Sequence, residues 1–256
     1  MGVGHARPNL LVPTESPIHR LRPECKLAAT ILFVVAVVSA PREAIWVFGV
    51  FAAIVIAGAW LAHLPLLVLA RRLTVELPFI AFAVLLPFLS PGPDVEVLGV
   101  SLSADGLWAA WNIVVKGTLG IAATAVLAAT TPVPSLLSGL ERLHMPRLVI
   151  AVAGFMIRYA DVLTAESRRM QVARLSRGYD PRWFWQVKAV ATSTGTLFVR
   201  SFERGERVHL AMLARGYSGT MPCTDVQSAA VGRDWAVPMA VPIVATALTC
   251  LAWIVR

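Results

Sequence analysis

The sequence predicts an all-α, polytopic helical membrane protein with about five transmembrane helices and additional cytoplasmic helices. Of its 256 residues, 57% are hydrophobic and only 15% are charged, whereas a soluble domain is nearer half apolar and a quarter charged. Two long uncharged runs, 44–62 and 235–255, are each long enough to cross about 30 Å of hydrocarbon at about 1.5 Å per residue. These two observations set the class of protein.

The other elements of the membrane region follow in chain order. A polar, basic lead-in occupies residues 1–26, where Ser16-Pro17 and Arg22-Pro23 are expected to break any helix. Four spans are expected within residues 27–129 and a fifth within 234–256; the first four are 27–40, 44–62, 73–89 and 106–129. The first is short, and the snorkelling stem of Lys26 is expected to lengthen it.

The connections are short, and their charges orient the chain. A tight turn is expected at 41–43, and the loop 90–105 carries acidic residues without Lys or Arg, with a strand-like piece at 95–102. Fourteen of the 23 Lys and Arg residues lie between Arg142 and Arg233. Basic segments beside spans are cytoplasmic by the positive-inside rule, so the lead-in and the region 130–233 are predicted inside and the C-terminus outside.

The charge layout also bears on partners. Although the net charge is +8, the basic residues of 130–233 are interleaved with acidic ones beside membrane spans. This layout favours a lipid bilayer over nucleic acid as the partner, with attraction to anionic headgroups as a secondary effect.

The region 130–233 is expected to form a coupling domain of four helical segments. They are a short amphipathic helix at 135–143, a long helix at 147–177, an interfacial helix at 183–199 and a charged helix at 200–215. Pro146 is expected at the first position of the long helix. Trp183 and Trp185 are expected to anchor the interfacial helix at the headgroups.

An octet in this region occurs twice, 38 residues apart. Residues 173–180 read Ala-Arg-Leu-Ser-Arg-Gly-Tyr-Asp, and residues 211–218 read Ala-Met-Leu-Ala-Arg-Gly-Tyr-Ser. The shared residues are Ala173/Ala211, Leu175/Leu213, Arg177/Arg215, Gly178/Gly216 and Tyr179/Tyr217. Each Arg-Gly closes a charged helix, so the duplication predicts two similar docking sites on a partner that is itself dimeric.

The residue types suit a docking tip. Arginine stays charged and holds a carboxylate with two hydrogen bonds, while Ser176 or Ala214 leaves room for close approach. Tyr179 and Tyr217 are candidates to pack beside the tip. A simpler interpretation needs no partner: glycine supplies a left-handed cap, and the helix dipole favours a C-terminal arginine by about 0.3–1 kcal/mol.

Several motifs resemble the transmembrane proteins, or T components, of energy-coupling factor (ECF) transporters. They are Ser16-Pro-Ile-His-Arg-Leu-Arg-Pro23 with Lys26-Leu27, Gly139-Leu140 with Met145-Pro146, Arg158-Tyr159 with Glu166, and the block 200–219. The block is similar to the cobalt-transporter, CbiQ-type branch. The resemblance covers nearly the whole chain and is strongest over 132–219.

The resemblance implies a non-catalytic scaffold in a prokaryotic plasma membrane. In the family, two Ala-Arg-Gly motifs dock into grooves of two ATP-binding-cassette (ABC) ATPase subunits, and the membrane helices hold a substrate-binding S component. Here the second motif is intact as Ala214-Arg215-Gly216, and the first reads Ser176-Arg177-Gly178. Cobalt is the implied cargo, with nickel or a vitamin as the alternatives.

No cofactor and no metal site is expected on this chain. Its five histidines are scattered without metal-ligand spacing, and it lacks a phosphate-binding loop, so ATP hydrolysis is assigned to the partners. Glu76 and Lys116 are intramembrane charges that pair across helices, snorkel to the membrane interface or line a transport path. Two other functional classes stay open: an intramembrane enzyme using Arg158, Asp161 and Glu166, and a permease that binds cargo within its own spans.

Overall fold

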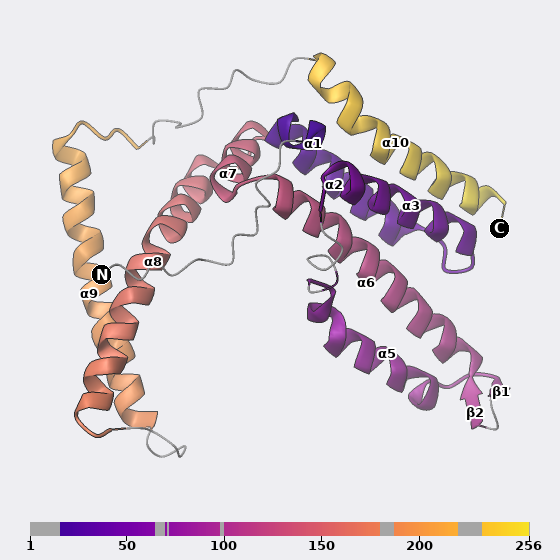
Figure 1. Ribbon diagram of the computed structural model, residues 1–256, viewed down its shortest axis with the longest axis horizontal. Coiled ribbons are helices and arrows are strands. Elements are labelled where there is room, and N and C mark those ends of the chain that lie inside the picture. The colour runs from indigo at the N-terminus through magenta and orange to yellow at the C-terminus, as the bar shows by residue number, and fades with distance from the viewer. Residues whose placement is uncertain are drawn as a thin grey trace. The chain divides into compact units, whose positions relative to one another are not determined.

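The computed structural model describes residues 16–64, 70, 72–97, 100–179, 187–219 and 232–255. The chain divides into two compact units, of which the first comprises Met1–Leu143 and Gln227–Arg256 and the second His144–Val226. Apart from one short hairpin, the regular elements of the described residues are helices, which confirms the helical fold (Figure 1).

The first unit contains most of the helices. They are α1 (Pro17–Arg20), α2 (Pro23–Ser39), α3 (Ile45–Leu61), the 3-10 helix η1 (Thr74–Glu76), α5 (Leu77–Leu89), α6 (Ala104–Thr130), α7 (Val133–Arg142) and α10 (Gly232–Ile254). The second unit contains α8 (Arg147–Ser176) and α9 (Val187–Ala214). Helices α6, α8 and α10 are long and apolar enough to cross a membrane, and Ile45–Leu61 and Thr74–Leu89 are shorter apolar helices.

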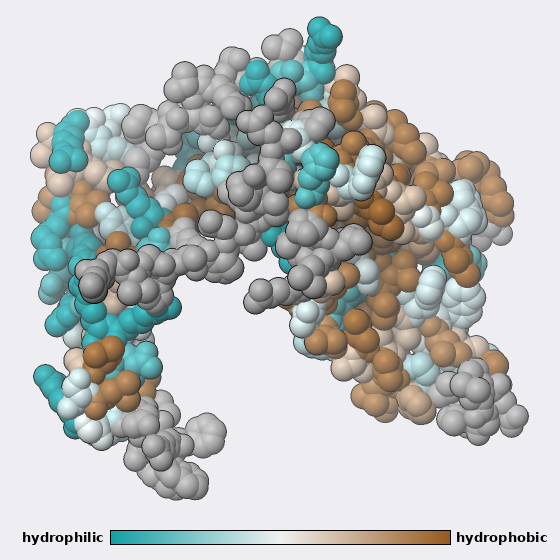
Figure 2. Space-filling view, viewed as in Figure 1, coloured by the Kyte–Doolittle hydropathy of each residue, from teal (hydrophilic) through white to brown (hydrophobic). Residues whose placement is uncertain are grey.

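The apolar exterior of the first unit fits a lipid-facing surface. Hydrophobic residues cover much of the face of this unit that Figure 2 shows, whereas hydrophilic residues gather on α8 and α9. On α5 the large side chains Phe79, Phe82 and Phe88 are all exposed. Exposed aromatic rings in such numbers mark contact with lipid or with another membrane protein.

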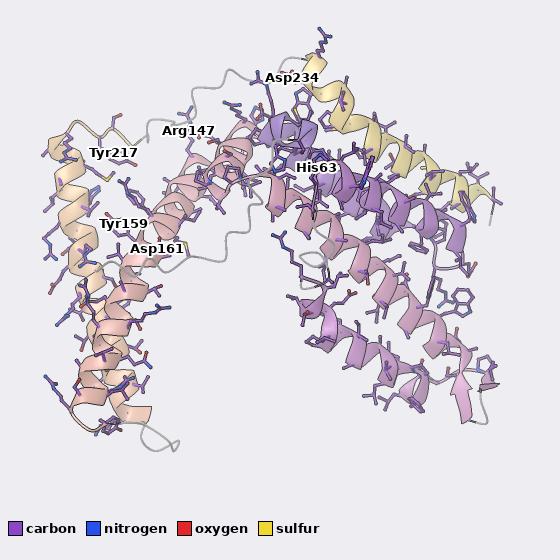
Figure 3. All side chains as sticks on the ribbon, in the orientation of Figure 1. His63, Arg147, Tyr159, Asp161, Tyr217 and Asp234 are labelled. Atoms are coloured by element: carbon purple, nitrogen blue, oxygen red, sulfur yellow. The ribbon has the colours of Figure 1, made fainter. Side chains whose placement is uncertain are left out.

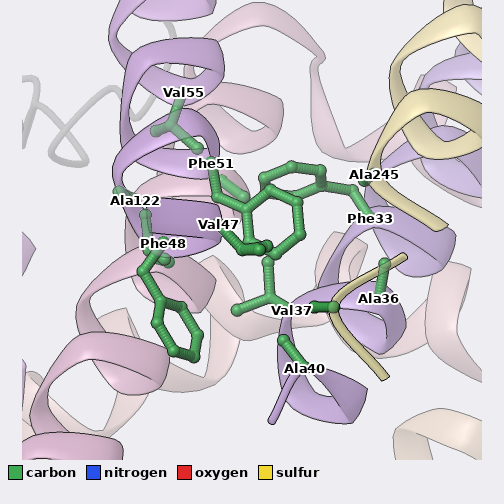
Figure 4. Packing of buried hydrophobic residues seen from close by; sticks show 13 residues of the cluster. Phe33, Ala36, Val37, Ala40, Val47, Phe48, Phe51, Val55, Ala122 and Ala245 are labelled. Carbon is green, nitrogen blue, oxygen red and sulfur yellow. The ribbon is translucent and has the colours of Figure 1, made fainter. Parts of the chain in front are cut away.

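Helix α2 lies at the centre of the first unit, where it packs against α6, α7 and α10. The core combines large rings with alanines, and Phe51 is fully buried beside Phe33, with 5.6 Å between ring centroids (Figure 4). Ala122 of α6 and Ala245 of α10 belong to the same cluster. Small residues at these positions let the helices approach closely, as membrane helices do.

The C-terminal end of α2 has all four of its last carbonyl groups hydrogen-bonded. In order, Ala36 O accepts from Thr249 Oγ1 at 3.2 Å, Val37 O from Ala40 N at 3.3 Å, Val38 O from Lys116 Nζ at 2.7 Å, and Ser39 O from Trp253 Nε1 at 3.0 Å. Lys116 also donates to Ala40 O at 2.9 Å. A helix of 17 residues is only about 25 Å long. These donors allow it to end inside hydrocarbon, where open carbonyl groups are costly.

A second lysine caps α6 in return. Lys26 is buried and donates from Nζ to Thr130 O, the last residue of α6, at 3.1 Å. The expected lengthening of the first span by Lys26 is confirmed, because α2 begins at Pro23, but the expected snorkelling of Lys26 is wrong, because its ammonium group binds a helix-end carbonyl. The antiparallel helices α2 and α6 each supply a lysine to the other's C-terminal end.

The predicted pairing of Glu76 with Lys116 is also wrong. Glu76 is buried, and its Oε2 accepts a hydrogen bond from Thr118 Oγ1 at 2.9 Å. Its Oε1 lies against Gly117, where an added Cβ would stand 2.5 Å away. Lys116 is occupied by the α2 carbonyls instead, and Glu76 Oε1 is buried without a hydrogen-bond partner among the described residues.

Several element boundaries differ from the sequence-based expectation. Pro17 and Pro23 begin helices rather than break them, because proline needs no N–H in a first turn and has a fixed φ. Pro146 is the N-cap of α8 and not its first residue. The expected strand-like piece is an antiparallel hairpin of β1 (Asp94–Val97) and β2 (Val100–Ser103).

The expected interfacial helix and the charged helix after it are one continuous helix, α9. The boundary expected at Val199 and Arg200 is therefore absent, because no glycine or proline separates the two segments. Trp183 and Trp185 lie outside the described residues. The predicted coupling domain of 130–233 was defined by its side of the membrane and stays a prediction; by packing, α7 belongs to the first unit.

Candidate functional site

The first copy of the repeated motif forms a C-terminal cap on α8. Gly178 has a φ of +74°, and its N–H donates to Leu175 O at 2.9 Å. Tyr179 N–H donates to Arg174 O at 3.2 Å. These two bonds and the left-handed glycine define a Schellman motif, which satisfies carbonyl groups at the helix end.

The second copy forms the same cap on α9. Gly216 has a φ of +83°, its N–H donates to Leu213 O at 3.0 Å, and Tyr217 N–H donates to Met212 O at 3.0 Å. The glycine cap predicted from the sequence is therefore confirmed at both positions. The same five residue types at the same offset produce the same local geometry twice.

Both caps present an exposed arginine. Arg177 and Arg215 occupy the C-cap positions and both side chains are exposed. Within the described part of the chain, neither guanidinium group has an ion-pair partner. The helix dipole favours each charge where it stands, and the donors of both arginines are available to a partner.

The surface around each arginine is matched as well. Val172 and Leu210, which share the offset of 38, are 62% and 64% exposed, and Leu175 and Leu213 are 46% and 49% exposed. Large apolar side chains left this open at two equivalent positions indicate two equivalent contact surfaces. We call residues 172–179 the first tip and residues 210–217 the second tip.

Small residues keep each tip open to close approach. Ala173 and Ser176 on the first tip, and Ala211 and Ala214 on the second, are exposed, whereas Tyr179 and Tyr217 are half-buried. An added Cβ at Gly178 or Gly216 would meet no atom within 4 Å. The chain itself therefore leaves these glycines uncovered, and another backbone has room to lie against them.

The two tips lie at opposite ends of one helix pair. Glu166 of α8 accepts from Arg200 of α9 at 2.7 Å, and Arg174 donates to Ser193 at 3.3 Å, so the two helices run antiparallel (Figure 1). Arg177 of the first tip is about one turn beyond Arg174. The second tip begins 17 residues after Ser193 and lies at the other end of α9, where Figure 3 labels Tyr217. Counted from the Arg174–Ser193 contact, three residues of α8 and 22 residues of α9 separate the two arginines, which is roughly 40 Å along the helices at about 1.5 Å per residue.

The three residues of the alternative enzymatic site all lie on α8, and one of them joins this helix to α9. Glu166 forms ion pairs with Arg200 at 2.7 Å and with Arg169 at 3.7 Å, and it holds α8 and α9 together. Arg158 and Asp161 lie on exposed positions of α8. Among these three residues, Glu166 has a clear structural task, which is to join the two helices.

Sequence reasoning found the arginines, glycines and tyrosines of the tips but missed Val172 and Leu210. The signal was present, because both positions are apolar at the same offset as the identical residues. They were overlooked because valine and leucine are not identical. Their exposure, which only the structure shows, makes them part of the contact surface.

The fold and the tips define a helical membrane protein that exposes two helix ends of the same construction. Comparison with known proteins identifies its family. A family model described as CbiQ, cobalt transport protein, matches residues 14–224. The chain is 30% identical over 245 residues to the energy-coupling factor transporter transmembrane protein EcfT of Heliobacterium modesticaldum, covering 90% of this chain and 91% of that one.

Two further relatives have slightly lower identity. The cobalt transport protein CbiQ of Rhodobacter capsulatus is 28% identical over 170 residues, covering 66% of this chain and 68% of that protein. An uncharacterised protein of Methanocaldococcus jannaschii is 26% identical over 215 residues, covering 79% and 72%.

The chain belongs to the CbiQ family, as the sequence motifs predicted. It is a T component of an energy-coupling factor transporter, a membrane subunit that is not itself an enzyme. The family match spans α1 through α9 and includes both tips.

Proposed function

We infer that this T component couples ATP hydrolysis by two ABC ATPase subunits to substrate release from an S component, and that each tip docks one ATPase. The observation that carries the proposal is the pair of matched tips. Two like sites roughly 40 Å apart at opposite ends of a helix pair suit two like partners, because a single groove cannot hold both ends.

The chemistry of each tip supports docking to an acidic groove. An exposed guanidinium group offers a fixed fork of donors that matches a carboxylate, and the neighbouring leucine adds apolar area. Arginine beside apolar side chains is the composition typical of interface hot spots. The small residues and the uncovered glycine let the partner's surface come close to the helix end.

Purification distinguishes the scaffold from the other two classes. A scaffold expressed with its ATPases and S component co-purifies with them, shows no ATP hydrolysis alone and binds no cargo alone. Turnover by the isolated chain would favour an enzyme centred on Arg158, Asp161 and Glu166. Cargo binding by the isolated chain would favour a permease.

Cobalt is the proposed cargo, held by the S component and not by this chain. The family description names cobalt transport, and so does the name of the Rhodobacter capsulatus relative. Uptake of radioactive cobalt(II) by cells that express the whole complex tests the cargo, with nickel(II) as competitor. Uptake of nickel or of a vitamin in place of cobalt would overturn this assignment and leave the scaffold role in place.

The proposed orientation places the N-terminus and both tips in the cytoplasm and the C-terminus outside. The support is the basic composition of 130–233 against the acidic loop 90–105. A reporter enzyme active only in the cytoplasm, fused after residue 256, is expected to be inactive. Activity of that fusion would reverse the last span.

A further inference from the structure

The chain passes from one unit to the other twice. In the sequence, the first crossing follows α7 and the second precedes α10. The chain enters the second unit after α7, because α7 ends at Arg142 and the second unit begins at His144. It returns before α10, because the second unit ends at Val226 and α10 begins at Gly232. Along the chain, α7 and α10 are therefore the elements of the first unit that are joined to the second unit.

The element before the first crossing, α7, is fastened to the start of α2 by a buried ion pair. Arg142 Nη1 donates to both carboxylate oxygens of Glu24, at 3.0 and 3.2 Å. The Glu24 side chain is 3% exposed and that of Arg142 is 23% exposed. The two backbones also approach closely, because a Cβ added at Gly139 would stand 3.1 Å from Glu24 N.

The element after the second crossing, α10, is fastened to the same point. Arg22, the N-cap of α2, lies with its Nε 2.8 Å from Asp234 Oδ2. Asp234 is in the first turn of α10, and Figure 3 labels it at the start of that helix. Glu24 therefore holds α7, and Arg22 holds α10. The two residues carry opposite charges and lie two positions apart at the start of α2.

We propose that Arg22 and Glu24 form a joint through which movement of the second unit is passed to the membrane helices. The inference rests on the proposed function, since it assumes that the ATPases move the second unit. Both residues are positioning residues: they fix where α7 and α10 meet α2, the central helix of the first unit. A polar joint suits this task, because charge pairs fix register and orientation more sharply than apolar contacts.

Breaking the joint should uncouple the transporter and leave its assembly intact. Glu24→Gln keeps the shape of the side chain and removes the charge that holds Arg142. The tips are not altered, so the ATPases should still co-purify and hydrolyse ATP. The cobalt transported per ATP hydrolysed should fall by about 5- to 150-fold, the usual size of coupling between two sites.

The experiment uses the whole complex in lipid vesicles, with uptake of radioactive cobalt(II) and ATP hydrolysis measured together. The reversed pair, Glu24→Arg with Arg142→Glu, should restore at least part of the ratio. Arg22→Gln breaks the more exposed contact and carries the test if Glu24→Gln does not fold. Asp105→Asn is the matched control, since it breaks an exposed pair with Arg42 that is 3.8 Å long and lies away from both crossings.

The outcomes separate the joint from the function on which it rests. A lower transport ratio in Glu24→Gln or Arg22→Gln, with Asp105→Asn unchanged, supports the joint. An unchanged ratio of cobalt transported to ATP hydrolysed in a folded Glu24→Gln or Arg22→Gln complex overturns the proposed joint. An equally large fall in this ratio in Asp105→Asn would overturn it too. A wild-type chain that neither binds ATPases nor transports would contradict the proposed function instead.

Discussion

Replacing Lys116 by methionine tests whether a lysine of α6 closes the end of α2. Methionine has similar length and is apolar, so the substitution removes the ammonium group with little change in packing. It removes the two hydrogen bonds that Lys116 Nζ donates to Val38 O and Ala40 O, at 2.7 and 2.9 Å.

The size of the effect follows from these two bonds. A hydrogen bond from a charged donor contributes about 1.5–3 kcal/mol in soluble proteins, whereas polar contacts inside membrane proteins average about 0.6 kcal/mol. The half-buried ammonium also regains solvation when the protein unfolds. We therefore expect Lys116→Met to lower the free energy of unfolding by about 1–3 kcal/mol, or the midpoint by about 2–12 °C.

Thermal unfolding of the purified chain in lipid nanodiscs measures this loss. Lys188→Met is the matched control, because Lys188 is exposed on α9, and its effect should stay within about 0.5 kcal/mol. A Lys116→Met chain as stable as the wild type would refute the capping argument. An equal loss from Lys188→Met would show that removing any lysine has this effect.

Three further substitutions probe packing, the tips and the core, each read by the same unfolding assay. Gly106→Ala should cost about 1–3 kcal/mol, because the new Cβ would stand 2.7 Å from the backbone of α5. Gly120→Ala on the same helix meets nothing within 4 Å and should not destabilise; equal losses would contradict the close-approach argument. Gly216→Ala should cost about 1–2 kcal/mol because its φ is +83°. Gly205→Ala, at an ordinary helical position of α9 with open space, should be neutral or stabilising. A larger loss from Gly205→Ala than from Gly216→Ala would refute the cap. Phe51→Ala should cost about 3–5 kcal/mol because the ring is fully buried, and a loss below about 1 kcal/mol would place Phe51 outside the core.

Much of this architecture could be predicted from the sequence because the relevant signals are local. The spans at 44–62, 73–89, 106–129 and 235–255 are apolar runs, and each corresponds to an apolar helix. The caps at Gly178 and Gly216 follow from glycine after a helix, and the offset of 38 made the two tips visible together. In each case the decisive residues are close in sequence.

The misplaced features depend on residues far apart in the chain. The sequence shows Lys26 and Lys116 as charges in apolar surroundings, but it does not show their partners, which lie at the ends of other helices. Thr130 is about a hundred residues from Lys26. Ala40 is about eighty residues from Lys116. Local signals were ambiguous at Pro17 and Pro23 as well. A proline both ends and begins helices, and Pro23 begins one.

Affinity of the purified chain for its ATPases, compared between two double variants, tests the central claim most directly. Arg177→Ala with Arg215→Ala removes both tip charges, and Arg169→Ala with Arg207→Ala removes two exposed arginines at the same offset of 38. If the tips dock the ATPases, each tip arginine contributes about 2–4 kcal/mol, so the first variant should bind at least about 30-fold more weakly. The second should bind nearly as the wild type does. Wild-type affinity in the first variant, or equal losses in both, would contradict the account.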